Sequence, residues 1–192
     1  MLKNKNIKLV LGSKSPRRQE LIQQITSNVE IRIQDVEEIY PDNLVASKVP
    51  EYLSKLKAQA LISSLEENEI IICSDTVVIL NDSILGKPAN LEEAKTMLRQ
   101  LSGQKHSVIT GCYLISKNSE RSFSCQTDVY FNTLEEETIN HYVETFKPLD
   151  KAGSYGIQEW IGIIGIEKID GCYYNVMGLP VSKLIDEINQ MN

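Results

Sequence analysis

The sequence predicts an α/β protein built on a mixed β-sheet, and three observations lead to this class. Short apolar runs rich in Val and Ile alternate along the chain with amphipathic helical patterns. Several helical patterns begin at residues that favour helix N-termini. Clusters of turn residues separate one element from the next, so strands and helices interleave rather than forming separate blocks.

In the first half of the chain, residues 7–11 form an apolar run typical of a strand, and a helical pattern with Leu21, Ile22 and Ile25 follows. Residues 29–33 predict a second strand, and residues 49–65 predict a helix. The apolar positions of that helix are Tyr52, Leu53, Leu56, Ala60 and Leu61.

Residues 70–73 and 77–80 are β-branched runs typical of a strand buried on both faces, and the turn at 81–83 predicts a hairpin return over 84–85. Asn90, with Glu93 at the third helical position, predicts the start of a helix over 91–101. Strands are expected at 107–115, 123–131 and 161–166. Thr133 with Glu136 suggests a capping box for the next helix, and Val181, Leu184, Ile185 and Ile188 predict the last one.

The composition narrows the possible functions. The 192 residues are 42% hydrophobic, enough for one domain with a substantial core, and the net charge of -6 argues against a general nucleic-acid or anionic-membrane binder. No apolar run approaches membrane-spanning length and the start does not resemble a signal peptide, so we expect a cytoplasmic protein. The four cysteines and two histidines are dispersed, which favours structural roles over metal binding, disulfides or nucleophilic catalysis.

Residues 13–18 read Ser-Lys-Ser-Pro-Arg-Arg and lie between a strand pattern and a helix pattern. Ser15 is a good N-cap, and Pro16 falls at the first helical position. Arg17 and Arg18 are unusual in a first turn, because a helix start already carries partial positive charge. The segment therefore predicts a phosphate site. The alternative is a solvated helix start whose arginines pair with surface carboxylates.

Asp75 interrupts an apolar strand pattern. Burying a carboxylate is unfavourable unless it is paired, hydrogen-bonded or bound to a cation. We therefore predict a general base or metal ligand at a strand kink facing a cleft. The alternative is a carboxylate satisfied by backbone N–H groups at a bulge.

Other candidate residues carry weaker signals. Lys57 lies inside the apolar stripe of its helix, which is unusual for a charged residue, and the alternative is a lysine whose stem packs there while its ammonium reaches water. Lys87 lies between Gly86 and Pro88, where it is either a phosphate contact or an ordinary turn lysine. Glu37 and Glu38 offer hard oxygen ligands for Mg²⁺ or Mn²⁺, or form a solvated loop. The loop 150–158 is either a connector or a ligand loop in which Gln158 reads a base edge.

No P-loop and no dinucleotide-binding glycine motif is present. The segments 13–18, 57–58, 74–78, 86–88, 101–103, 106–111, 150–158 and 178–180, taken in order, resemble the Maf family of nucleoside triphosphate pyrophosphatases over almost the whole chain. The resemblance implies one Maf-like domain over 1–192. It also implies an elongated mixed sheet flanked by helices, with two lobes around a deep cleft, similar to the inosine triphosphate pyrophosphatases.

The resemblance further implies hydrolysis of dTTP, UTP or modified pyrimidine nucleotides to the monophosphate and pyrophosphate, with a divalent cation, Mg²⁺ or Mn²⁺. By position, Asp75 resembles the proton acceptor. The residues expected to set substrate choice are Arg17, Thr76 and Gln158. The residues expected to bind phosphate are Ser13, Arg18, Lys57 and Lys87, and the residues expected to bind metal are Glu37 and Glu38, of which either could serve.

The sequence departs from the family pattern at Gly12 and Ser74, where alanine is common, and at Glu159, where a glycine is usual. Glu159 would add negative charge beside the substrate loop. Two alternative functions are a non-catalytic nucleotide-binding regulator of cell division and a purine, inosine-type pyrophosphatase. We expect no nucleic-acid or membrane partner, and a homodimer is an open expectation.

Overall fold

The computed structural model describes residues 1–4 and 6–191. Across these residues, seven strands form one sheet in the order β2-β1-β3-β5-β6-β7, with β4 paired to β3. β1 (Lys8–Leu11) runs parallel to β2 (Val29–Ile31) and to β3 (Glu69–Leu80). β4 (Ser83–Leu85) is antiparallel to β3, and β7 (Ile166–Asp170) is antiparallel to β6 (Glu120–Phe131). β5 (Lys105–Ile115) completes the sheet. The predicted mixed α/β class is confirmed.

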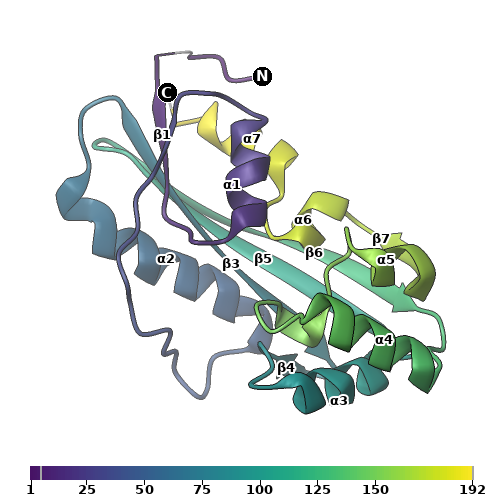
Figure 1. The fold of residues 1–192 in the computed structure, drawn as a ribbon. Helices are drawn as coiled ribbons and strands as arrows, with labels where there is room; N and C mark the ends of the chain where they lie inside the picture. The colour runs from purple at the N-terminus through teal and green to yellow at the C-terminus, as the bar shows by residue number, and fades with distance from the viewer. Residues whose placement is uncertain (5, 192) are drawn as a thin grey trace. The chain divides into compact units, whose positions relative to one another are not determined.

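The chain divides into two compact units. The first comprises Met1–Asp75, Thr110–Cys125 and Gly178–Asn192, and the second comprises Thr76–Ile109 and Gln126–Met177. The first unit contains α1 (Pro16–Gln23), α2 (Val49–Leu61) and α7 (Val181–Ile188) (Figure 1). The second contains α3 (Leu91–Leu101), α4 (Glu136–Phe146), α5 (Trp160–Gly165) and α6 (Tyr173–Met177). Single 3-10 turns lie at Ala46–Lys48, Ile62–Ser64 and Ala152–Ser154.

Each unit has its own apolar core. In the first, Ala58 and Leu61 of α2 pack with Val10, Ile71 and Cys73 of the central strands. Burial raises the pKa of the Cys73 thiol to about 12, so this cysteine remains a small neutral core residue, as its position in a strand pattern predicts.

In the second unit, α3 and α4 lie side by side (Figure 1) and bury residues such as Leu98, Ile139 and Tyr142 against strand residues including Val129. The described residues include no helix that is both long and apolar enough to cross a membrane.

Several local predictions are confirmed. The Asn90 side chain accepts a hydrogen bond from the Glu93 N–H at 2.9 Å, and the Glu93 carboxylate accepts one from the Ala89 N–H at 2.7 Å. The hairpin between β3 and β4 turns at Asn81 and Asp82, which have φ angles of 48° and 65°. Asn and Asp tolerate this left-handed backbone better than other non-glycine residues do, which explains the turn signal.

The prediction of a strand at 161–166 is wrong. This segment forms α5, and β7 begins only at Ile166. Gly162 explains the difference, because a Cβ atom there would lie 1.8 Å from the carbonyl oxygen of Ile157. The glycine lets the chain fold back on itself, and its N–H donates a hydrogen bond to the Glu159 carbonyl at 2.9 Å. The β-branched composition is therefore overridden by a local packing requirement.

Four smaller predictions also need correction. α4 begins at Glu136 with Glu135 as its N-cap, and Thr133 does not cap it. β3 runs without a break through Asp75, so the two apolar runs expected on either side of this residue form one strand. The α-helix beginning at Val49 ends at Leu61 and continues as a 3-10 turn. Tyr52, expected in the apolar stripe of that helix, is 41% exposed.

Candidate functional site

The turn between β1 and α1 is organised by its serines. Pro16 occupies the predicted first helical position, but the Ser15 hydroxyl makes no capping bond, so that part of the prediction is wrong. Instead the buried Ser13 hydroxyl accepts a hydrogen bond from the Ser15 N–H at 3.2 Å. Gln19 donates to the Ser13 carbonyl at 3.1 Å. These bonds fix the backbone ahead of the two arginines, which a phosphate-binding turn requires.

Arg18 contacts two segments that are distant in sequence and one residue of its own turn. Its Nε donates to the carbonyl of Gly178 at 2.9 Å, and its Nη1 donates to the carbonyl of Ser74 at 2.6 Å. The same nitrogen lies 3.5 Å from the Ser13 hydroxyl. Burial lowers the pKa of the Arg18 guanidinium, and the neighbouring Asp75 carboxylate offsets part of this effect. Arg18 therefore holds the end of the first turn beside Asp75.

Asp75 and Lys57 form the centre of the site. The Lys57 side chain extends from α2 and its Nζ lies 2.5 Å from Asp75 Oδ1 on β3. The same nitrogen lies 2.8 Å from Glu38 Oε1 in the loop after β2. Asp75 is only 9% exposed, and the Lys57 ammonium offsets the cost of burying its charge. The anomalous lysine and the anomalous aspartate of the sequence thus belong to one arrangement.

The acidic residues allow a test of whether a divalent cation fits here. Asp75 and Glu38 direct carboxylate oxygens at a single cationic nitrogen, that of Lys57, and such hard oxygens suit Mg²⁺ or Mn²⁺. No cluster of three or more acidic, His or Cys ligands occurs within residues 1–4 and 6–191. Mg²⁺ commonly takes one or two protein carboxylates and completes its shell with water and substrate phosphates, so this pair of oxygens fits the ion.

The other residues of the N-terminal motifs are more exposed. Glu37 and Glu38 are both exposed, and the Glu38 carboxylate reaches Lys57, which makes Glu38 the acidic neighbour of the Asp75–Lys57 pair. Arg17 is half-buried in the first turn of α1. Lys14 forms an exposed ion pair with Asp35 at 2.6 Å.

The second unit carries the remaining candidates. Thr76 follows Asp75 on β3 and is half-buried, whereas Lys87 and Gln158 are exposed on loops. The Gly153 N–H donates to the Gly86 carbonyl at 3.1 Å, which joins the loop of Gln158 to the turn of Lys87. Gly153 has a φ of 68°, and a Cβ atom there would lie 3.0 Å from Val78. A glycine is therefore required where the two loops meet.

Glu159, the departure expected to add negative charge, is directed into a hydrogen-bonded network. Its Oε1 lies 3.0 Å from the ammonium of Lys151, and Tyr142 donates its hydroxyl hydrogen to the other carboxylate oxygen. The Tyr142 oxygen in turn accepts from the Gly156 N–H at 3.1 Å. Lys151 also lies 2.7 Å from Asp150, so its ammonium offsets part of the charge of Glu159, and the network closes the loop that carries Gln158.

Sequence reasoning missed these supporting residues. The Gly178 and Ser74 carbonyls bind Arg18 through their backbone, so no side-chain pattern could reveal them. Lys151 and Tyr142 are buried and pair with Glu159, which the sequence marked only as a departure from the family pattern.

Comparisons with known proteins agree with the motifs. A family model described as Maf-like protein matches residues 8–191. A dTTP/UTP pyrophosphatase of Cytophaga hutchinsonii is 50% identical over 186 residues, covering 97% of this chain and 85% of that protein. A dTTP/UTP pyrophosphatase of Parabacteroides distasonis is 47% identical over 190 residues, covering 98% of each.

The fold itself has a solved counterpart. The Ham1 protein of Staphylococcus aureus matches with a TM-score of 0.57 over 96% of this chain and 100% of that one, at 13% identity. This likeness concerns the fold alone, and it agrees with the mixed α/β fold that the sequence predicts. The family match over 8–191 and the relatives near 50% identity show that the chain belongs to the Maf-like protein family.

Proposed function

We propose that this chain hydrolyses nucleoside triphosphates, with dTTP and UTP as the preferred substrates, to the monophosphate and pyrophosphate. The names of its relatives and the family match support the reaction class. The observation that carries the proposal is the buried Asp75 carboxylate, held 2.5 Å from Lys57 beside the arginine-rich turn. Such a site combines a proton acceptor with cations for polyphosphate.

In this proposal the cationic side chains hold the triphosphate. Ser13 and Arg18 contribute from the β1–α1 turn, Lys57 from α2, and Lys87 from the turn after β4. An ammonium has three donors, and Lys57 contacts two carboxylates, which leaves a direction for a phosphate oxygen. Positioning and charge neutralisation supply most of the rate gain in phosphoryl transfer.

Asp75 accepts the proton of the water that attacks the α–β linkage. Its position on a continuous strand and its bond to Lys57 fix the direction of its oxygens. A fixed carboxylate close to fixed cations places the base and the phosphates in one small volume.

A divalent cation, Mg²⁺ or Mn²⁺, belongs to the proposal. Glu38 would hold it, with Asp75 as the neighbouring carboxylate and Glu37 as the less favoured alternative. When bound, the ion supplies charge neutralisation to the phosphate oxygens.

Substrate choice is assigned to Arg17, Thr76 and Gln158. Gln158 offers one donor and one acceptor group, which suits the carbonyl and N–H edge of thymine or uracil. The Gln158→Ala variant should reduce the differences in kcat/KM among nucleotides with different bases more than it lowers the rate with the best substrate. An unchanged substrate profile would remove Gln158 from base reading.

The test is a pyrophosphate-release assay against common and modified nucleoside triphosphates, with added Mg²⁺ or Mn²⁺ and with EDTA. The Asp75→Asn variant should remain folded and lose at least ~100-fold in kcat, the low end for a removed general base. Asp186→Asn is the matched control, because Asp186 is exposed on α7 and such surface changes have small effects, about 2-fold or less. A near-normal rate for Asp75→Asn would exclude this residue as the base.

Two other outcomes would redirect the proposal. Nucleotide binding without pyrophosphate release would favour a non-catalytic regulator of cell division. Preference for inosine-type triphosphates would favour the purine alternative. The buried aspartate argues against the regulator, since a carboxylate repels a phosphate ligand that it does not help to process. The cytoplasmic location, a homodimeric state and a single Maf-like domain over 1–192 stay predictions.

A further inference from the structure

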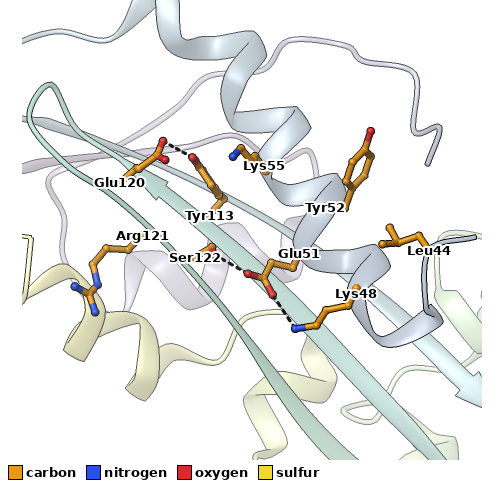
Figure 2. Close-up of a pocket in the computed structure, with 9 residues that line it drawn as sticks. All are labelled: Leu44, Lys48, Glu51, Tyr52, Lys55, Tyr113, Glu120, Arg121 and Ser122. Atoms are coloured by element: carbon orange, nitrogen blue, oxygen red, sulfur yellow. Dashed lines mark hydrogen bonds and ion pairs between the residues drawn. The ribbon is translucent and has the colours of Figure 1, made fainter. Parts of the chain in front are cut away.

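We propose that a cavity on the side of α2 opposite to Lys57 binds small planar aromatic anions. Residues on an α-helix are about 100° apart, so Lys48, Tyr52 and Lys55 share one face and Lys57 points the other way. The cavity lies between that face and the β5–β6 hairpin, within the first unit (Figure 2). Its volume is about 490 Å³, in the range of small-molecule sites.

The aromatic side chains give this cavity its preference for flat ligands. Tyr113 of β5 is 4% exposed, and its hydroxyl donates to the carboxylate of Glu120 (Figure 2), which fixes the ring in place. Burial and Glu120 raise the pKa of Tyr113 to about 12, so it stays a neutral donor near pH 7. Tyr52 also lines the cavity, and 41% of the residue is exposed to solvent. A large aromatic ring left this exposed offers a stacking surface.

The charges of the lining favour an anion. Both carboxylates there already accept hydrogen bonds from lining residues, Glu120 from Tyr113 and Glu51 from Ser122 at 2.6 Å. The lysines have donors to spare. Lys48 is 64% exposed along its side chain and lies 3.9 Å from Glu51, at the outer limit of an ion pair. Lys55 is exposed, with its Nζ 5.5 Å from the centre of the Tyr113 ring.

The position of Lys55 also argues against a cationic ligand. Its ammonium already lies over the Tyr113 ring, where a positively charged ligand would otherwise gain a cation–π contact. A ligand with a negative group near Lys55 or Lys48 and a ring beside Tyr52 would use both the ammonium groups and the exposed aromatic ring of the lining. In the lining, the side chains of Lys48, Lys55 and Arg121 outnumber the carboxylates of Glu51 and Glu120 by one, although the protein as a whole carries a net charge of -6.

The experiment is a titration of the full chain with three probes, followed by amide-resolved NMR. Naphthoate carries a flat ring and a charge, naphthylmethanol carries the ring alone, and cyclohexanecarboxylate carries the charge alone. We expect saturable shifts at Tyr52, Lys55 and Tyr113 with naphthoate and at least ~10-fold weaker binding of the other two, equivalent to about 1.4 kcal/mol. Equal binding of all three probes, or shifts confined to other segments, would overturn the proposal.

Variants assign the binding to the cavity. Lys55→Glu and Tyr52→Ala should each weaken naphthoate binding about 5-fold or more, because the first removes an ammonium group and the second removes the stacking surface. Lys117→Glu and Tyr174→Ala are the matched controls, since both residues are exposed and lie outside the cavity lining. Weakening by the controls equal to that of the lining variants would show a nonspecific effect of charge or surface, and would also overturn the proposal.

Discussion

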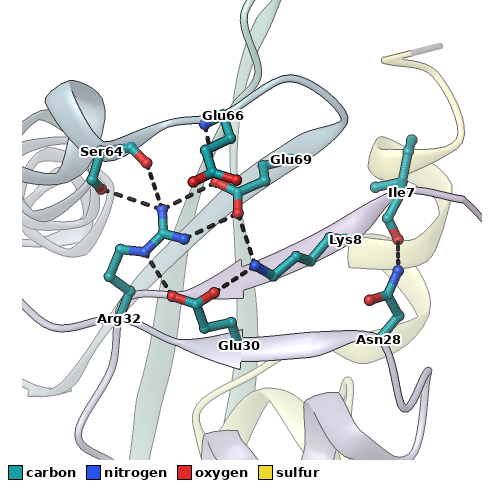
Figure 3. Close-up of polar contacts among 8 residues, drawn as sticks. All are labelled: Ile7, Lys8, Asn28, Glu30, Arg32, Ser64, Glu66 and Glu69. Carbon is teal, nitrogen blue, oxygen red and sulfur yellow. Dashed lines mark hydrogen bonds and ion pairs between the residues drawn. The ribbon is translucent and has the colours of Figure 1, made fainter.

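Removal of the Glu69 charge should destabilise the first unit and change its response to acid. Glu69 begins β3 (Figure 3), and its side chain is 2% exposed. Arg32 donates to both carboxylate oxygens at 3.0 Å, and Lys8 lies 3.1 Å from one of them. The N–H of Glu66 donates a further bond at 3.0 Å. We propose the Glu69→Gln variant as the perturbation, because it keeps the size of the side chain.

The magnitude follows from the pKa of Glu69. Its hydrogen bonds from Arg32, above all, lower the pKa from 4.5 to about 2. At about 1.4 kcal/mol per pKa unit, this depression corresponds to roughly 3 kcal/mol of folding free energy. Because the folded pKa is the lower one, the contribution is present above pH 4.5 and is lost as the pH falls towards 2.

The assay is chemical denaturation of the wild type and the variant at several pH values, with the free energy of unfolding compared at each. At neutral pH the variant should lose about 2–4 kcal/mol, and its stability should fall less steeply with acid than that of the wild type. Glu67→Gln is the control, because Glu67 is the exposed neighbour. A loss below ~0.5 kcal/mol, the usual size of a surface change, would refute the assigned role of this ion-pair network.

Two further predictions concern α2 and the loop of Gln158. Gly111→Ala should lower the free energy of unfolding by about 2 kcal/mol or more, because a Cβ atom would lie 2.3 Å from the Glu51 nitrogen. Gly86→Ala is its control, since nothing lies within 4 Å of a Cβ atom there, and equal losses would contradict the packing argument. Glu159→Gln should raise the KM for dTTP about 5-fold with little change in kcat, because the loop loses its ion pair with Lys151. Glu167→Gln, at an exposed residue of β7, should leave KM unchanged, and a KM for Glu159→Gln equal to wild type would show that the network does not support the loop.

The amino-acid sequence by itself determined the class of fold and most of its elements. Local chemistry was sufficient where a feature depends on neighbouring residues. The Asn90–Glu93 cap and the turn at Asn81 and Asp82 are examples, because each satisfies backbone groups within a few residues of itself. The anomalies in the patterns, above all Asp75 and Lys57, also marked residues that the fold uses together.

Tertiary packing decided what local patterns could not. The segment 160–165 became a helix because Gly162 lets the chain pack on Ile157, although its composition favours a strand. The partners of Arg18 are carbonyls of Ser74 and Gly178, which lie 56 and 160 residues away in the sequence. Long-range contacts of this kind depend on the arrangement of whole elements and leave no periodic trace in the chain. The sequence therefore singled out charged residues such as Asp75 and Lys57, and only the folded structure showed that these two lie within hydrogen-bond distance of each other.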